Sequence, residues 1–303
     1  MSAGSGVLRC VESAARLSAA LARASTPADP YRWRVFDVCK DAQTGDCDSV
    51  VHWRSFPDLL ADEALMDAWV GSYGERDARR EVGGAVTALR VCAPVMDLVV
   101  GLLVVDQCAV PLPSEGVQLG LDSSGRIIGI ALRDGTLVID PSGKATGDPA
   151  TARGALASYL AGELSALLQP AFEAIRTRSR YGLRGMWGQA VDEIAAAAMR
   201  RARLLGLDDG KAWRAAAELT DALAAVEPLV RRRPSAYAAE WSNGEVTFAV
   251  KGTCCLYFKV SADCDKQAYC MSCPLLADAE RAPRAASVLQ REYERLCRRP
   301  RAA

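Results

Sequence analysis

The chain has 303 residues, half of them hydrophobic and 24% charged, which is the composition of a globular protein with one large or two smaller domains. Its 37 basic residues balance its 37 acidic residues, and this zero net charge disfavours a general nucleic-acid binder. The single histidine, His52, excludes metal sites that need several histidines from one chain, so thiolates remain as the metal ligands to consider.

The N-terminal third is expected to mix helices with short strands. Apolar residues recur at three- and four-residue steps from position 5 to position 24, which predicts a helix. Two short strands, 33–39 and 49–53, are expected to flank a turn. Two more helices are predicted at 57–73 and 76–106, and the second should bend at Pro94, because proline removes a backbone donor.

The most apolar stretch, residues 91–105, is interrupted by Pro94 and Asp97 and is shorter than the ~20 residues of a membrane-spanning helix. It is therefore predicted to be a buried core helix. The first residues are small and polar, and no basic segment leads into an apolar one, so no secretory signal is expected. We expect a cytoplasmic protein without a membrane span.

The pattern changes to alternating apolar residues between positions 116 and 140. Three strands separated by glycine-containing turns predict an antiparallel meander: 117–121, 127–132 and 137–139. A loop at 141–149 marks the expected boundary between an N-terminal region, 1–145, and a second region, 146–303.

The second region is expected to be helical, with a hairpin around Asn243 and Gly244. Its predicted helices are 151–178, 186–205, 208–226 and 275–299, and its predicted strands are 237–241 and 245–251. The fold class predicted for the whole chain is α+β: mostly helical, with a central antiparallel meander and a C-terminal hairpin that carries a cysteine site.

Residues 251–274 contain five of the eleven cysteines: Cys254, Cys255, Cys264, Cys270 and Cys273. Disulfides are disfavoured, because thiols stay reduced in the cytosol and a chain of this length can bury a core without them. Redox chemistry at the C-x-x-C of Cys270 and Cys273 would leave the adjacent pair without a role. A metal site uses both pairs.

The spacing also bears on which metal is bound. Structural zinc needs four thiolates around one ion. Neighbouring residues of an extended strand point to opposite faces, so Cys254 and Cys255 reach one ion only across a sharp backbone bend. A [2Fe–2S] cluster takes two thiolates on each of two irons, and adjacent cysteines suit that wider target better. The cysteine spacing therefore favours a cluster and leaves zinc open.

The cysteine segment resembles the C-terminal signature of the FhuF-like ferric-siderophore reductases, C-C-x(10)-C-x-x-C with basic residues before the first pair and aromatic residues after it. The matching residues are Lys251, Cys254, Cys255, Tyr257, Phe258, Lys259, Cys270, Cys273 and Pro274. The gap between the pairs is fourteen residues here, and it includes Cys264 as an alternative ligand to Cys270.

A second element, Trp187-Gly188-Gln189, is similar to a Trp-Gly-Asn element of the same family. The other interpretation of Trp187 is a tryptophan that anchors helix packing.

The resemblance implies a [2Fe–2S] cluster held by Cys254, Cys255, Cys270 and Cys273. It also implies an oxidoreductase that passes single electrons to siderophore-bound Fe(III) and releases Fe(II) in the cytoplasm. The expected partners are a ferric siderophore, with the hydroxamate type favoured, and an electron donor such as a ferredoxin, a flavoprotein or a small reductant. No flavin or nicotinamide motif is visible.

Candidate substrate contacts are Lys251, Tyr257, Trp187, Arg231, Arg232 and Arg233. Backbone N–H groups at 253–256 are expected to donate hydrogen bonds to the sulfurs. Two alternatives from other functional classes remain open: a helical binding module stabilised by zinc, and an iron–sulfur redox sensor.

Overall fold

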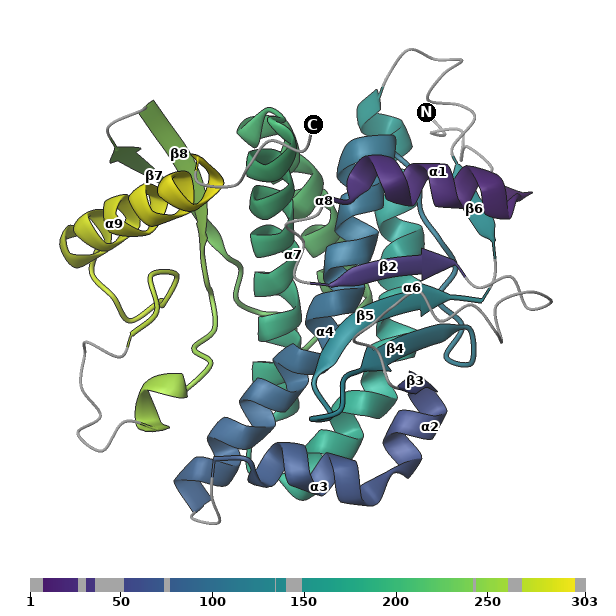
Figure 1. The fold of residues 1–303 in the computed structure, drawn as a ribbon, viewed down its shortest axis with the longest axis horizontal. Coiled ribbons are helices and arrows are strands. Elements are labelled where there is room, and N and C mark those ends of the chain that lie inside the picture. The colour runs from purple at the N-terminus through teal and green to yellow at the C-terminus, as the bar shows by residue number, and fades with distance from the viewer. Residues whose placement is uncertain are drawn as a thin grey trace.

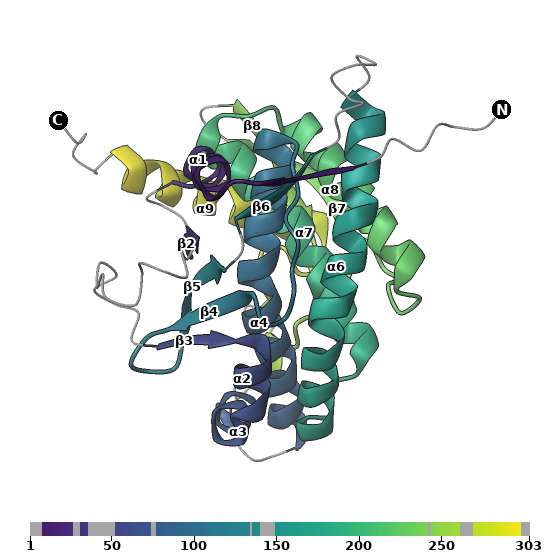
Figure 2. The same ribbon diagram turned by 90° about the vertical axis from the view of Figure 1, so that its right-hand side faces the viewer.

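The computed structural model of the protein describes residues 8–26, 31–35, 52–73, 77–133, 135–139, 149–241, 244–260 and 269–297. The fold is α+β and mostly helical, as predicted. In the views of Figures 1 and 2, a four-stranded sheet lies on one side of the long helix α4, and the C-terminal hairpin and last helix lie beyond α7 on the other.

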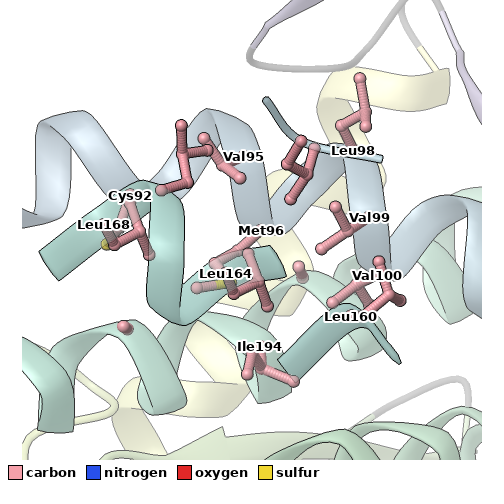
Figure 3. Packing of buried hydrophobic residues seen from close by; sticks show 14 of the residues in the cluster. Cys92, Val95, Met96, Leu98, Val99, Val100, Leu160, Leu164, Leu168 and Ile194 are labelled. Carbon is pink, nitrogen blue, oxygen red and sulfur yellow. The ribbon is translucent and has the colours of Figure 1, made fainter. Parts of the chain in front are cut away.

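Four helices form the centre of the molecule: α4 (Asp77–Asp106), α6 (Pro149–Arg178), α7 (Leu183–Leu205) and α8 (Asp209–Val226). They bury a continuous apolar cluster, and Figure 3 shows part of it, with Met96 of α4 near Leu164 of α6 and Ile194 of α7. The predicted division at residues 145 and 146 stays a prediction; in space, both regions contribute to this one core.

Helix α4 is long and apolar enough to cross a membrane by length and composition alone, but 78% of its most apolar window is buried inside the protein. Such burial is what a core helix of a globular protein shows. The prediction that residues 91–105 form a buried helix is therefore confirmed, and Pro94 lies within α4 without ending it.

Charged residues also lie in this core and join three helices. The guanidinium group of Arg201 donates to Asp97 Oδ2 at 2.6 Å and to the carbonyl of Ala24, at the end of α1 (Ala14–Ala24), at 2.8 Å. Arg200 donates to Asp97 at 2.7 Å and to Glu193 at 3.0 Å. A buried charge is tolerated when it is paired in this way, and the network fixes α7 against α4 and α1.

The four-stranded sheet has the order β2 (Arg32–Val35), β5 (Ile127–Leu132), β4 (Val117–Leu121) and β3 (His52–Ser55). Strand β2 pairs with β5 in parallel, and the other two pairs are antiparallel. Both strands expected here are therefore found, and they lie at the two edges of the sheet, with β5 and β4 between them. The residues of the expected turn, 41–46, and Cys39 and Cys47 beside them, lie outside the described residues.

Strand β6 (Thr136–Ile139) leaves the predicted meander. It pairs antiparallel with β1 (Arg9–Glu12), and only β4 and β5 form the expected antiparallel pair. Strand β1 also corrects the predicted first helix, because α1 begins at Ala14, where Ser13 caps it by accepting the backbone N–H of Arg16.

The predicted helix over 57–73 is two helices, α2 (Phe56–Ala61) and α3 (Glu63–Gly71). Asp62 separates them and caps α3 by accepting the backbone N–H of Leu65 at 3.0 Å. A capping aspartate supports a new helix start at that position.

The C-terminal part follows the prediction closely. Strands β7 (Ser235–Trp241) and β8 (Gly244–Val250) form an antiparallel hairpin. Strand β8 packs against α7, and the last helix, α9 (Asp278–Cys297), packs against β7. The chain between β8 and α9 carries the cysteine segment, which leaves β8, runs to η1 near the start of α4, and leads on to α9 (Figure 1).

Candidate metal centre

The two cysteine pairs come together because the two ends of the segment are joined. Strand β8 ends at Val250, and the backbone N–H of the next residue, Lys251, donates to the carbonyl of Ser272 at 2.9 Å. Cys270 and Cys273 are linked by a turn in which the N–H of Cys273 donates to the carbonyl of Cys270 at 2.9 Å. The two cysteine pairs, which are almost twenty positions apart in the sequence, thus lie side by side.

Each thiol of the first pair faces one thiol of the second. Cys255 hydrogen-bonds to Cys270, and Cys254 hydrogen-bonds to Cys273. Cys273 is buried, Cys270 is exposed, and the other two are half-buried. The structure therefore brings the four predicted ligands together as two facing pairs, at a place that reaches the surface. Cys264 lies outside the described residues.

Backbone N–H groups surround the sulfurs. The N–H of Leu256 donates to Cys254 Sγ at 3.4 Å, that of Tyr257 donates to the Cys255 thiol, and that of Leu275 donates to the Cys273 thiol. Each donor lies two residues after its cysteine. The expectation of sulfur hydrogen bonds is confirmed at Leu256, and such bonds stabilise thiolates that ligate a metal.

A backbone bend follows the adjacent cysteines. Leu256 has a φ of 60°, in the left-handed region that residues other than glycine rarely adopt and that costs on the order of 1 kcal/mol. This bend turns the chain sharply after Cys255 and leads into the short 3₁₀ helix η1 (Tyr257–Val260). Strain of this kind persists where the surrounding structure requires it, which is common at functional sites.

Helix α7 anchors the first cysteine pair through Asp192. Its buried carboxylate accepts the backbone N–H of Gly252 at 2.6 Å and that of Thr253 at 3.0 Å. Burial raises the pKa of Asp192 to about 7, although the two N–H donors and the nearby Lys251 act to lower it. The carboxylate fixes the backbone immediately before Cys254.

Helix α7 also contacts the segment through Gly188 and Gln189. A Cβ atom on Gly188 would lie 2.1 Å from Thr253 Oγ1, so only glycine permits this close approach. Gln189 Nε2 donates to the Tyr181 hydroxyl at 2.8 Å, and that hydroxyl donates to the carbonyl of Cys254 at 3.4 Å. Two residues of the Trp-Gly-Gln element thus contact or support the cysteine segment.

Trp187 itself lies elsewhere. Its side chain is fully buried, its Nε1 donates to Gln169 Oε1 at 3.1 Å, and its ring packs edge-on against Phe172. The tryptophan cannot reach a substrate at the surface, so the structure does not support it as a substrate contact. Trp187 instead anchors the packing of α7 against α6.

Helix α9 anchors the second cysteine pair through two arginines. The buried guanidinium group of Arg281 donates to the carbonyls of Met271, Cys273 at 3.1 Å and Leu276 at 2.6 Å. Arg284 donates to the carbonyl of Tyr269 at 2.9 Å. These carbonyls belong to the loop that presents Cys270 and Cys273, so α9 determines the conformation of that loop.

The electrostatics favour a thiolate at the exposed end of the site. The hydrogen bond from Cys255, with the positive charge of Lys251 nearby, lowers the pKa of Cys270 to about 6, against the opposing effect of burial. The same hydrogen bond, together with burial, raises the pKa of Cys255. Cys255 thus keeps its proton and donates it in a hydrogen bond to the thiolate of Cys270. The thiolate is the form of cysteine that binds metals.

The two lysines flanking the first pair have different surroundings. Burial acts to lower the pKa of Lys251, but Cys255, Cys270 and nearby carboxylates raise it on balance, so this lysine is a cation beside the thiols. Lys259 pairs with Glu81 of α4 at 2.8 Å and fastens η1 to that helix. Lys251 is therefore the cation that acts on the sulfurs.

The other predicted contacts lie at the rim. Tyr257 is exposed, and its ring packs edge-on against Tyr73 at 6.0 Å between centroids. Arg231, Arg232 and Arg233 are exposed, and the backbone of Arg233 lies against Gly252, two residues before Cys254. Arg233 also pairs with Asp221. The arginine run is thus next to the cysteine segment.

Sequence reasoning missed Asp192, Tyr181, Arg281 and Arg284 as residues that hold the segment. One signal was present: Gln189 and Asp192 are polar residues three positions apart on a helix whose neighbouring positions are apolar and small. Polar groups on a buried helical face need partners, and here the partners belong to the cysteine segment and to Tyr181.

The four cysteine thiols form a donor set of two pairs, which matches the number and grouping of thiolates that a [2Fe–2S] cluster takes. In the part of the chain that the structure describes, no three side chains among His, Cys, Asp and Glu gather closely enough to hold one metal ion. The four thiols instead form two pairs, each accompanied by backbone N–H groups directed at sulfur. A [2Fe–2S] cluster takes two thiolates at each iron.

No protein-family model matches the chain, and no curated protein matches it.

Proposed function

We propose that the protein is an oxidoreductase that reduces siderophore-bound Fe(III) by one electron and releases Fe(II). The observation that carries this proposal is the meeting of two cysteine pairs in a site where backbone N–H groups donate to sulfur and a lysine adds positive charge. The residues that would hold a [2Fe–2S] cluster are Cys254, Cys255, Cys270 and Cys273.

When bound, the cluster would supply a carrier of single electrons, with a potential that depends on hydrogen bonds to sulfur and on exposure. The chain contributes the rest. Asp192 and Arg281 hold the backbone of the two cysteine loops from α7 and α9. The positive charge of Lys251 favours the more negative, reduced form of the site.

The exposure of the site suits a bulky substrate. Cys270 is exposed, and Tyr257 beside the first pair exposes about half of its surface, 52%. A ferric chelate can therefore approach the sulfurs from outside the protein. Siderophores bind Fe(III) far more tightly than Fe(II), so one added electron is enough to loosen the chelate.

The electron donor is proposed to be an acidic protein, such as a ferredoxin or a flavoprotein, or a small reductant. Arg231 and Arg232 are exposed next to the cysteine segment and add positive charge at its rim. Positive charge steers acidic partners to a surface and raises association rates. We also propose that the protein acts in the cytoplasm, where a reduced donor is present.

The proposal is tested by mixing under anaerobic conditions. The purified protein is reduced and mixed with an equimolar ferric trihydroxamate in the presence of an Fe(II) trap, while the visible spectrum is followed. The expected result is a return of the oxidised bands as trapped Fe(II) appears. Protein that is colourless after growth in iron-rich medium would favour the zinc-stabilised binding module. Bands that never respond to ferric chelates would favour the redox sensor.

A further inference from the structure

A cavity of about 420 Å³ lies between α4 and the start of β5, apart from the cysteine segment. Ligand sites in proteins commonly have volumes of about 300–1,000 Å³. Two arginines and five aromatic or aliphatic residues line it: Tyr31, Val86, Leu89, Arg90, Arg126, Ile127 and Ile128. Among these described lining residues none is acidic, so the wall combines positive charge with apolar surface.

One arginine of this wall is held in place by an aromatic ring. The guanidinium group of Arg90 lies over the ring of Trp69, 5.4 Å from its centroid. The ring is fixed in turn, because Trp69 Nε1 donates to the carbonyl of Gly125 at 3.0 Å. A guanidinium group stacked on a fixed ring keeps its N–H donors free for an anion and loses little entropy on binding.

The second arginine lies across the cavity on the turn that leads into β5. Arg126 pairs with Asp122 at 3.2 Å, and its side chain is 72% exposed. Hydrogen bonds from Ser124 and from the backbone N–H of Arg126 lower the pKa of Asp122 to about 2, so one carboxylate partly balances the two arginines. The two lining arginines outnumber this carboxylate, while Glu193, Asp97 and Arg200 also act on Tyr31.

The cavity and the cysteine segment share helix α4. Glu81 of α4 holds Lys259, four residues after Cys255, and Val86 of the cavity lies five residues further along the helix, or about 8 Å. The aromatic contact of Tyr73 with Tyr257 provides a second connection, because Tyr73 lies close enough to Arg90 and to Cys255 for both to act on its pKa. The cavity opens on the sheet side of α4, away from the face that Glu81 presents to Lys259, and it is linked to the cysteine segment through this helix and the Tyr73–Tyr257 contact.

We propose that this cavity binds the ferric chelate, and that Arg90 and Arg126 select chelates with net negative charge, such as tris-catecholates, over neutral trihydroxamates. The aliphatic residues and Tyr31 would contact the apolar parts of the ligand. This inference rests on the proposed function and changes its substrate class from the hydroxamate type expected from the sequence.

Binding is measured separately from reduction by using gallium(III) chelates, because Ga(III) has the size and charge of Fe(III) but does not accept the electron. The metal-loaded protein is titrated calorimetrically with a Ga(III) tris-catecholate and with a Ga(III) trihydroxamate. The variants are Arg90→Gln, Arg90→Lys and Arg126→Gln. The control is Arg176→Gln, an arginine on α6 that is partly exposed and paired with Glu173.

The catecholate is expected to bind more tightly than the hydroxamate. R90Q should weaken catecholate binding about tenfold, because a charge-assisted hydrogen bond is lost, and R126Q should weaken it less, because that side chain is exposed. R90K should retain part of the affinity, and R176Q should change nothing. Binding of the catecholate should also weaken as salt is added.

Equal binding of the catecholate by wild type, R90Q and R126Q would overturn the inference, and so would tighter binding of the hydroxamate. The R126Q variant tests the cavity even if R90Q disturbs the fold. The side chain of residue 126 lies in a turn and does not pack on Trp69, as that of Arg90 does. Arginine-dependent binding without reduction of the Fe(III) chelate would leave the inference standing and refute the proposed function. Reduction of the Fe(III) chelate without arginine-dependent binding would support the proposed function and refute the inference about the cavity.

Discussion

The carboxylate of Asp192 accepts the backbone N–H of Gly252 at 2.6 Å, which joins the middle of helix α7 to the residue two positions before the first cysteine. The second carboxylate oxygen accepts the next backbone N–H, at Thr253. A side chain sixty positions earlier in the sequence thus sets the path of the chain into the adjacent cysteines. The metal centre proposed here depends on this helix as much as on the cysteines.

Asp192→Asn tests that dependence. The amide can accept only one of the two N–H groups and presents an NH₂ to the other, so a hydrogen bond to a charged group is lost and a buried donor is left without an acceptor. We expect the free energy of unfolding to fall by about 1–3 kcal/mol in urea titrations, with less iron bound per chain. Asp67→Asn, which removes an exposed ion pair with Arg178, is the control and should change stability by less than about 1 kcal/mol. Equal stability of D192N and wild type would contradict the proposed anchor.

Gly188→Ala tests the close approach of α7 to Thr253. The added methyl group would meet Thr253 Oγ1 at 2.1 Å and Cβ at 3.0 Å, so the segment has to move. We expect a loss of about 1–3 kcal/mol in stability and weaker iron retention. The matched control is Gly162→Ala on α6, where a Cβ meets nothing within 4 Å. That variant should gain up to about 1 kcal/mol from helix propensity. The prediction fails if both variants gain stability.

Arg281→Gln tests the anchor of the second cysteine pair. Glutamine cannot replace three charge-assisted hydrogen bonds to the carbonyls of Met271, Cys273 and Leu276. We expect the loop to lose its fixed conformation, with a stability loss of at least about 2 kcal/mol and a faster loss of iron to a chelator. Arg184→Gln, exposed on α7, should leave both quantities unchanged. Iron loss at the wild-type rate in R281Q would argue against the assigned role.

The pH dependence of stability should carry the signature of Asp192. Burial raises its pKa in the folded protein from 3.8 to about 7. Between these values the folded state binds a proton that the unfolded state has released, so the stabilising contribution is complete below about pH 4 and is lost as the pH rises through about 7. Urea midpoints at about pH 5 and about pH 8 should differ more for wild type than for D192N. Identical pH dependence in the two proteins would contradict the assignment.

The helical part of the fold could be predicted well from the sequence, because its signal is local. The apolar periodicity of α6 and α8 lies within each helix, and their observed bounds differ from the predicted ones by two residues or fewer. The N-terminal errors have the opposite cause. Residues 9–12 fit a helical pattern, but they form a strand because β6, more than a hundred positions away, supplies its hydrogen bonds.

The candidate site likewise has features that the local sequence predicts and features that depend on residues distant in the sequence. The cysteines are visible in the sequence because their density is local, and the turn at Asn243 and Gly244 predicts the hairpin that delivers them. Asp192, Arg281 and Tyr181 act through backbone groups of a loop that is distant in sequence, and no spacing rule indicates such contacts. The left-handed conformation of Leu256 is equally hidden, since leucine gives no sign of it.

The central claim is that four cysteines hold a [2Fe–2S] cluster, and metal analysis of freshly purified protein tests it most directly. Iron, acid-labile sulfide and zinc are measured together with the visible spectrum for wild type and for Cys254→Ser, Cys255→Ser, Cys270→Ser, Cys273→Ser and Cys264→Ser. The account predicts iron and sulfide in equal amounts with visible bands in wild type and C264S, and loss of this native cluster in the other four variants. Colourless wild-type protein that holds zinc, or a C264S variant that lacks the cluster while C270S keeps it, would contradict the account.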